Sequence, residues 1–208
     1  MVEKGTIKMN REKLEKIIEK NRGFVTSKEL KVNSIPSIEL TRLVKKNIIV
    51  KIDSGFYARK DWVVDKYLVF QYCCSRYIYS FYSAIALLGL GDINPSYLEV
   101  TGPKNYRPMG KREDNVVTHP DINNERYHLG IEEVITPLGN KVLSYNAEKT
   151  VCDLIRNKEK IELEVFIKAI RAYSRRKDKN INRLMEYARV MKIENKVSNI
   201  MEIVLNED

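Results

Sequence analysis

The order of helix and strand signals along residues 9–59 constrains the fold of this chain more than any other feature. Three short stretches with helical periodicity come first, and two strand-like runs with a glycine between them follow. In the first stretch Leu14, Ile17 and Ile18 repeat at the i, i+3, i+4 spacing of one helix face. Three helices closed by a hairpin are the element order of a winged helix-turn-helix, and we expect this fold for the N-terminal domain.

Capping residues set the expected ends of these helices. Asn10 is placed to cap the first helix, and Thr26 or Ser27 the second, because their side-chain oxygens can accept the free N–H groups of a first turn. Pro36 suits the first position of the third helix, where its missing N–H costs nothing. That helix is predicted to run to about Lys46, and the hairpin that would form the wing follows it.

Net charge is concentrated in the same segment. Residues 1–60 hold 15 Lys or Arg and 7 Asp or Glu, a balance of +8 out of +9 for the whole chain. A basic excess on a small domain with helix-turn-helix signals is the pattern expected of a DNA-binding surface, and a winged helix used only for protein contacts is the alternative. The asymmetry also favours two domains, which we expect at residues 1–60 and 61–208.

The third helix is the candidate reader of the major groove. Arg42 can form two hydrogen bonds with a guanine, and Ser37 or Thr41 can reach a base edge or a phosphate. Ile38 can contact a thymine methyl group. The other DNA-binding candidates lie on the wing and at helix ends and would bind phosphates: Thr26, Ser27, Lys28, Lys45, Lys46, Lys51 and Arg59.

The second domain has mixed helix and strand signals, so the fold class expected for the whole chain is α+β. Helices are predicted at residues 62–74, 77–88, 147–157, 161–176, 181–191 and 193–205, and strands at 97–101, 115–119, 131–136 and 141–145. Asn146 and Asn180 are the expected caps of two of these helices. The prediction is a mixed α/β domain with a small sheet and several helices.

A run of basic residues near the end of the chain predicts a second basic surface. If the helix over residues 161–176 continues far enough, residues spaced by three or four line one side of it. The set is Lys168, Arg171, Arg175, Arg176, Lys179 and Arg183. It fits a second surface for nucleic acid or an acidic partner, and equally an ordinary solvated helix face. A basic loop over residues 104–112, with Lys104, Arg107, Lys111 and Arg112, is a further candidate.

No catalytic, cofactor-binding or metal-binding set emerges from the sequence. His119 and His128 have no second ligand at metal-binding spacing, and neither a Gly-rich phosphate loop nor a nucleophile elbow is present. The three cysteines are expected as small apolar residues of a reduced protein.

The acidic residues do not form a convincing set either. Glu132 with Glu133, and Glu148 with Asp153, are the pairs worth weighing for a metal-dependent nuclease. Glu148 and Asp153 lie five positions apart and do not share a helix face well, so a role at the helix dipole explains Glu148 better. Several acids meeting a lysine in space stay open as an alternative.

Three segments together resemble the AbiEi family. They are the end of the basic N-terminal domain, Val50–Ala58, the segment Ser80–Gly91 that ends in Gly-Leu-Gly, and the stretch Lys141–Asp153 with its Ser-Tyr-x-x-Glu-Lys-Thr pattern. The resemblance extends from about residue 9 to residue 190. AbiEi proteins are antitoxins and transcriptional repressors of bacterial abortive-infection (type IV toxin–antitoxin) systems.

The resemblance implies a function for each domain. The N-terminal domain would bind inverted repeats of double-stranded operator DNA in the promoter of its own operon. The second domain would counteract a nucleotidyltransferase toxin encoded beside it, directly or indirectly. The matching helix residues, Ser37, Thr41, Arg42 and Lys45, would contact DNA. No enzyme activity and no cofactor are expected.

Two other classes of function stay open from the sequence alone. One is a DNA-guided enzyme such as a metal-dependent nuclease, and the other is a transcription regulator whose second domain senses a small ligand. No apolar run approaches the roughly 20 residues of a membrane span, and the N-terminus shows no apolar signal region. We therefore expect a cytoplasmic protein without membrane contact.

Overall fold

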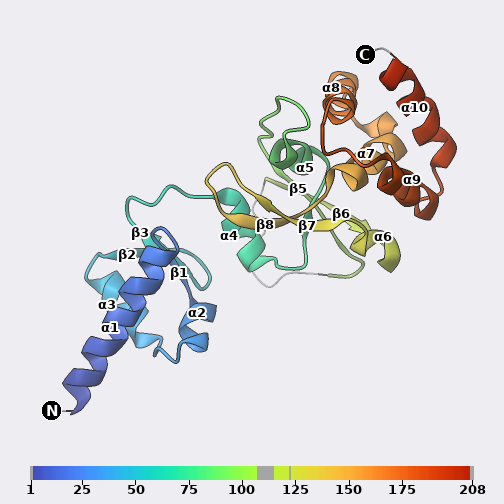
Figure 1. Cartoon of the computed structure of the whole chain (residues 1–208). Coiled ribbons are helices and arrows are strands. Elements are labelled where there is room, and N and C mark those ends of the chain that lie inside the picture. Colours follow the sequence, from blue (N-terminus) through green and yellow to red (C-terminus); the bar gives the residue numbers. More distant parts are fainter. Residues whose placement is uncertain (1, 107–114, 122, 207–208) are drawn as a thin grey trace. The chain divides into compact units, whose positions relative to one another are not determined.

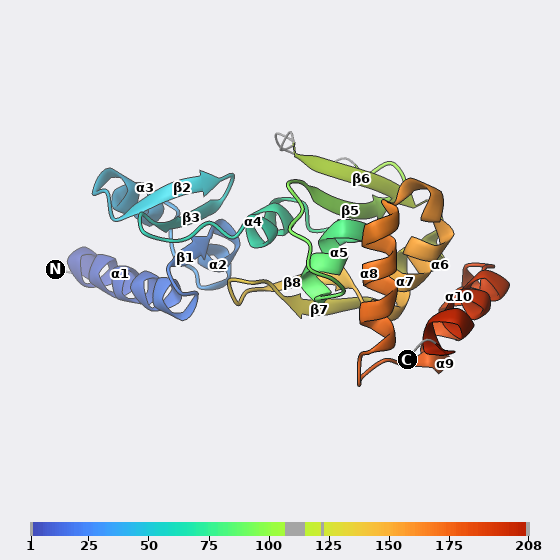
Figure 2. The ribbon, with the colours of Figure 1, turned by 90° about the horizontal axis from the view of Figure 1, so that it is seen from above.

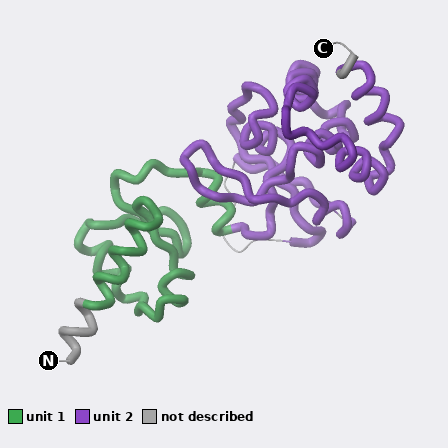
Figure 3. The backbone as a smooth tube through the Cα atoms, in the orientation of Figure 1, with its two compact units in different colours: residues 1–73 green, residues 74–208 purple. Residues whose placement is uncertain are grey.

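The computed structural model describes residues 2–106, 115–121 and 123–206, and the chain is a mixed α+β structure with two sheets (Figure 1). It divides into two compact units, Met1–Cys73 and Cys74–Asp208 (Figure 3). Residues 61–73, which the sequence predicts as part of the second domain, are grouped with the first unit.

The first unit combines helices with a small sheet. Its elements are α1 (Val2–Lys20), β1 (Phe24–Thr26), α2 (Ser27–Val32), α3 (Ile38–Lys45), β2 (Ile49–Asp53), β3 (Phe56–Arg59) and α4 (Lys66–Cys73). The strands form an antiparallel sheet of order β1-β3-β2. The predicted hairpin is confirmed, and Gly55 in its turn has a φ of +73°, which favours glycine.

The small sheet of the first unit has a different core on each face. On one face Val25 and Ile49 are fully buried among apolar residues of α1, α2 and α3. On the other face Phe24 stacks on Phe56 at 5.0 Å between ring centroids, and Trp62 lies 5.6 Å from both rings. Alternate strand residues therefore hold the helices on one side and the segment before α4 on the other.

Three predicted helix starts in the first unit are wrong. Because α1 already begins at Val2, Asn10 lies inside it and is buried instead of capping it. Helix α3 begins at Ile38, so Pro36 precedes it. The Pro36 carbonyl accepts the Glu39 N–H in a turn before the helix. Helix α4 begins only at Lys66, since the preceding Asp65 carboxylate accepts hydrogen bonds from the free N–H groups of the first turn.

The second unit contains a five-stranded sheet of order β6-β5-β4-β8-β7. Its strands are β4 (Ile78–Tyr79), β5 (Leu98–Pro103), β6 (Val116–Asp121), β7 (Ile131–Ile135) and β8 (Lys141–Tyr145). The neighbours β5 and β6 are parallel, as are β4 and β8, whereas β4 with β5 and β7 with β8 are antiparallel. The four strands predicted between residues 97 and 145 are confirmed.

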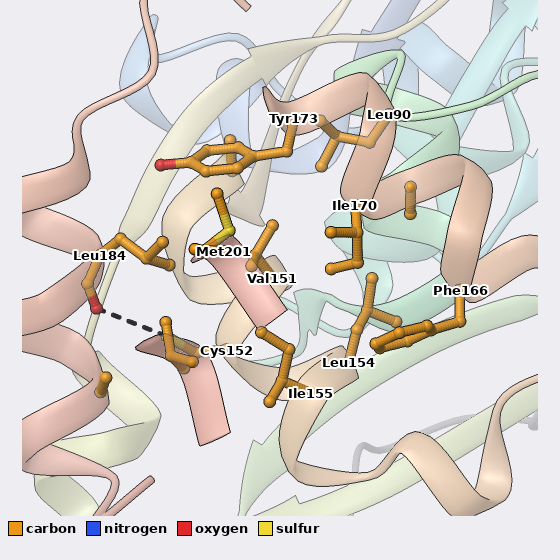
Figure 4. Packing of buried hydrophobic residues seen from close by; sticks show 14 of the residues in the cluster. Leu90, Val151, Cys152, Leu154, Ile155, Phe166, Ile170, Tyr173, Leu184 and Met201 are labelled. Carbon is orange, nitrogen blue, oxygen red and sulfur yellow. Dashed lines mark hydrogen bonds between the residues drawn. The ribbon is translucent and has the colours of Figure 1, made fainter. Parts of the chain in front are cut away.

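Helix α7 is the centre of the larger core. The helices of this unit are α5 (Phe81–Leu88), α6 (Asn124–His128), α7 (Ala147–Arg156), α8 (Leu163–Ser174), α9 (Ile181–Val190) and α10 (Glu194–Asn206), with a 3₁₀ turn at Lys158–Lys160. Helix α7 contacts α5, α8, α9 and α10, and α5 packs on strands β5, β7 and β8 of the sheet (Figure 2). Val151, Cys152 and Leu154 of α7 have no exposed surface (Figure 4).

The helix predicted over residues 77–88 is partly wrong. Ile78 and Tyr79 form the central strand β4, and the helix begins only at Phe81. The short helix α6 was not predicted. The caps at Asn146 and Asn180 are confirmed, since each side chain accepts an N–H from the first turn of its helix.

Candidate nucleic-acid interface

Helix α3 separates its buried residues from the predicted contact residues. Leu40 and Leu43 are 3% and 4% exposed and face the core of the first unit. The opposite side carries Ser37, Ile38, Thr41, Arg42 and Lys45, all of them exposed. Ile38 is 50% exposed, so it does not pack fully on a neighbouring helix. Helix α3 therefore presents two hydroxyls, a guanidinium, an ammonium and one apolar side chain to solvent.

An acidic neighbour holds the Arg42 guanidinium. Glu39 lies one turn earlier on α3 and is 5% exposed, and its Oε1 accepts a hydrogen bond from Arg42 Nη1 at 2.6 Å. The Arg42 side chain remains 44% exposed. The ion pair fixes one nitrogen of the guanidinium, and its remaining N–H groups can still donate to a partner. Glu39 is not among the residues predicted from the sequence, although its i, i+3 spacing to Arg42 is a signal for such a pair.

The N-terminus of α2 is closed by a capping box. Thr26 Oγ1 accepts the Glu29 N–H, and Glu29 Oε2 accepts the Thr26 N–H at 2.9 Å. Of the two predicted caps, Thr26 is therefore the one used. It is 5% exposed, and its hydroxyl serves the helix and is not presented to solvent. Lys28 is exposed on the first turn, and Ser27 is partly buried and donates its N–H to the Gly55 carbonyl.

The hairpin of β2 and β3 carries the remaining basic candidates of the first unit. Lys51 pairs with Tyr57 and Arg59 pairs with Ile49 across the two strands, so Lys51 and Arg59 lie on the same side of the hairpin. Both are exposed, as is Lys46 at the C-terminal cap of α3. Exposed cations thus flank α3 along the chain.

The predicted second basic surface is not one helix face. Helix α8 ends at Ser174, so Lys179 lies beyond it, in the connection to α9. Several of the charges are paired: Lys168 with Glu164 at 2.6 Å, Arg176 with Asp178 at 2.7 Å and Arg183 with Glu148 at 2.8 Å. Arg171 and Arg175 are exposed at the end of α8. A nucleic-acid role for this set stays a prediction, with less unneutralised charge than the sequence indicates.

The basic loop is described only in part. Lys104 is exposed just after β5. Arg107, Lys111 and Arg112 lie outside the described residues.

Glu148 holds two helices of the second unit together. Its Oε1 accepts the Asn180 N–H at 3.0 Å and the Tyr173 hydroxyl at 3.3 Å, and its Oε2 pairs with Arg183. Burial raises the pKa of Tyr173, and the adjacent Glu148 charge raises it further. Glu148 lies in the first turn of α7, where the sequence places it at the helix dipole, and it is 1% exposed. Its contacts link α7 to α8 and α9.

A buried ion pair in α7 is the main feature that the sequence reasoning missed. Lys149 is 1% exposed, and its Nζ lies 2.7 and 2.6 Å from the two carboxylate oxygens of Asp153. The same ammonium lies 4.2 Å from the ring centroid of Tyr145. Burial raises the pKa of the Asp153 carboxyl, and the Lys149 charge opposes this. The i, i+4 spacing of Lys149 and Asp153 on α7 could have revealed the pair.

The candidates for metal or thiol chemistry have structural explanations. His119 lies in β6, where its Nε2 is 2.7 Å from Glu99 Oε1. Burial raises the pKa of the Cys152 thiol to about 12, and its sulfur donates to the Leu184 carbonyl (Figure 4). Among the residues that the structure describes, no three His, Cys, Asp or Glu side chains gather to hold a metal ion.

Comparisons with known proteins bear on the first unit. Within the described part of the chain, no helix is both long enough and apolar enough to cross a membrane. Among curated proteins, none matches this chain. Residues 12–60 match a family model described as transcriptional regulator, AbiEi antitoxin. The resemblance inferred from the sequence is therefore confirmed over residues 12–60, which are similar to the AbiEi antitoxin family of transcriptional regulators and include α2, α3, the hairpin and residues 12–20 of α1.

Proposed function

We propose that the first unit is a winged helix-turn-helix that binds operator DNA upstream of its own gene and represses transcription. The observation that carries this proposal is the exposed face of α3, with Ser37, Thr41 and Arg42 opposite the buried Leu40 and Leu43. It lies within the range that matches the family of transcriptional regulators. Side chains of these types suit base edges in a major groove.

In this proposal each element of the first unit has a role on the duplex. Helix α3 enters the major groove, and the β2–β3 hairpin is the wing. Exposed cations beside it bind phosphates and contribute affinity without sequence preference. They are Lys28, Lys45, Lys46, Lys51 and Arg59. Two copies would read the two halves of the inverted repeat that the family resemblance implies.

A footprint on the DNA upstream of the gene tests the proposal. We expect protection of two half-sites related by inverted sequence, and loss of protection with Arg42→Ala. The control for nuclease activity is the protein incubated with the same DNA but without the reagent that cleaves DNA in the footprint. Uniform or absent protection would contradict operator binding, and cleavage that requires a divalent metal would favour the nuclease alternative.

We further propose that the second unit supplies antitoxin activity against a nucleotidyltransferase toxin encoded beside the gene, without catalysing a reaction itself. One support for antitoxin activity is the AbiEi match in the same chain. The support for a role without catalysis is that Glu148, His119 and Cys152 each make structural contacts.

The Arg42→Ala variant tests whether the two activities are separate. We expect it to rescue growth from the co-expressed toxin as well as the wild type does, while repression of a promoter reporter is lost. Equal loss of both would contradict a division of labour between the units.

A further inference from the structure

The second unit contains a polar pocket that the proposed antitoxin activity does not explain. It has a volume of about 300 Å³ and lies between the ends of β5 and β6, the start of α5 and the C-terminal half of α7. Because β5 and β6 are parallel, their carboxyl ends meet here, at Thr101 and at His119–Asp121. Carboxyl ends of parallel strands are a common place for small ligands to bind in α/β structures.

Two ion pairs line the pocket. One is the buried pair of Lys149 and Asp153, and the other joins Arg126 to Asp121 at 2.7 Å. Burial acts to raise the pKa of the Asp121 carboxyl, but hydrogen bonds from Arg126 and the Asn123 N–H hold that pKa below its usual range. Both carboxylates are thus matched by a cation.

The rim adds positive charge that the pocket does not neutralise. Arg156 at the end of α7 and Lys160 in the following 3₁₀ turn also line the pocket, and both are exposed. Neither forms an ion pair with any residue in the described ranges. Among the residues that line the pocket, four cations against two carboxylates leave an excess of +2, which favours an anionic ligand.

One wall of the pocket is aromatic. The rings of Phe81 and His119 lie 4.4 Å apart between centroids, and both line the pocket. Glu99 fixes this wall, because one of its oxygens lies 2.7 Å from His119 Nε2 and the other accepts the Tyr82 N–H next to Phe81. Phe81 keeps a φ of +46°, a conformation that is unfavourable for a residue with a side chain.

We propose that this pocket binds a nucleoside monophosphate, with the base against Phe81 and His119 and the phosphate on Arg156 and Lys160. Arginine and lysine are the usual partners of phosphate oxygens, and aromatic rings stack on bases of any sequence. A volume of about 300 Å³ is at the lower end for small-molecule sites, which favours a mononucleotide over a dinucleotide. The inference is independent of the proposed DNA binding, since it uses residues of the second unit alone.

Calorimetric titration of the full chain tests the inference. The ligands are the four ribonucleoside 5′-monophosphates, the matching nucleosides and inorganic phosphate. The double variant Arg156→Ala, Lys160→Ala removes the rim cations, and Lys177→Ala, Lys196→Ala removes two exposed lysines outside the pocket as a charge-matched control. All four substituted residues of these variants are exposed, so the fold is expected to persist, and the thermal unfolding midpoint checks this.

We expect at least one monophosphate to bind the wild type and the control variant equally, and to bind the rim variant at least about 10-fold more weakly, a loss of about 1.4 kcal/mol. Its nucleoside and inorganic phosphate should each bind about 10-fold more weakly than the monophosphate. Absence of binding by all four monophosphates, or equal affinity in the rim variant, would overturn the proposal. Inorganic phosphate binding as tightly as the nucleotides would overturn the role of the aromatic wall and leave only an anion site.

Discussion

Thr26 and Thr41 are the same residue type at two positions with opposite roles. The Thr26 hydroxyl completes the capping box of α2, whereas Thr41 is exposed on the free face of α3. We expect Thr26→Ala to lower the free energy of unfolding of the first unit by about 1 kcal/mol, because a helix cap is lost. Thr41→Ala should change it by less than about 0.5 kcal/mol, because no buried group is disturbed.

Trp62 provides the measurement for this pair of variants. It is the one tryptophan of the chain and packs against both Phe24 and Phe56, so denaturant curves followed by its fluorescence report on the first unit. In DNA binding the order should reverse, with Thr41→Ala weakening the preference for upstream DNA more than Thr26→Ala. Equal stability losses in the two variants would argue against the division between capping and contact residues.

At the scale of elements, the hairpin of β2 and β3 is expected to act through charge alone. Removing its cations with Lys51→Ala, Arg59→Ala should weaken binding to upstream and shuffled DNA by the same factor. The slope of log affinity against log salt should fall in magnitude by about 2, one unit for each lost phosphate contact.

The control for the hairpin variant lies on α1. Arg11→Ala, Lys16→Ala also removes two exposed cations from the first unit, at positions away from α3 and the hairpin in sequence. It should leave the salt slope nearly unchanged. An unchanged slope in the hairpin variant would mean that this hairpin does not reach phosphates.

Elements with a clear local signal could be predicted from the sequence. The hairpin around Gly55 and the helices after Asn146 and Asn180 follow from glycine and capping residues, whose effects act over one turn. The two-residue strand β4 could not, because Ile78–Tyr79 is too short to show a period and is extended only through its neighbours β5 and β8.

The same distinction applies to the sites. The exposed face of α3 could be predicted, since helical periodicity alone decides which residues face outward. The pocket of the second unit could not, because Phe81, His119 and Lys149 come from three distant segments that only the sheet topology brings together. For the basic run, the shared helix face depends on the helix over residues 161–176 continuing further. Helix α8 ends at Ser174, so Lys179 lies outside it.

At the scale of the whole molecule, the chain carries a separate probe for each unit. Cys152 is fully buried in the second unit, and burial raises the pKa of its thiol to about 12, so the unreactive thiol form dominates at pH 8. Cys73 and Cys74 are partly exposed. We expect a thiol reagent at pH 8 to modify Cys73 and Cys74 in the folded protein and Cys152 only after the second unit unfolds.

Comparing the two probes measures how far the units depend on each other. Cys152→Ala is the control that assigns the slow reaction. If Cys152 reacts as fast as the other two cysteines under native conditions, the core around α7 is more open than its burial indicates. If Cys152 reactivity and Trp62 fluorescence change at different denaturant concentrations, the units unfold separately.

In the proposed function, α3 reads the sequence of operator DNA. The most direct test of this role is the ratio of affinities for upstream and shuffled DNA over a series of salt concentrations, for the wild type, Arg42→Ala and the control Arg11→Ala. We expect a wild-type preference of at least about 10-fold that Arg42→Ala abolishes and Arg11→Ala preserves, with a steep salt dependence in all three. A wild type without preference, or an Arg42→Ala variant with the same preference, would contradict it.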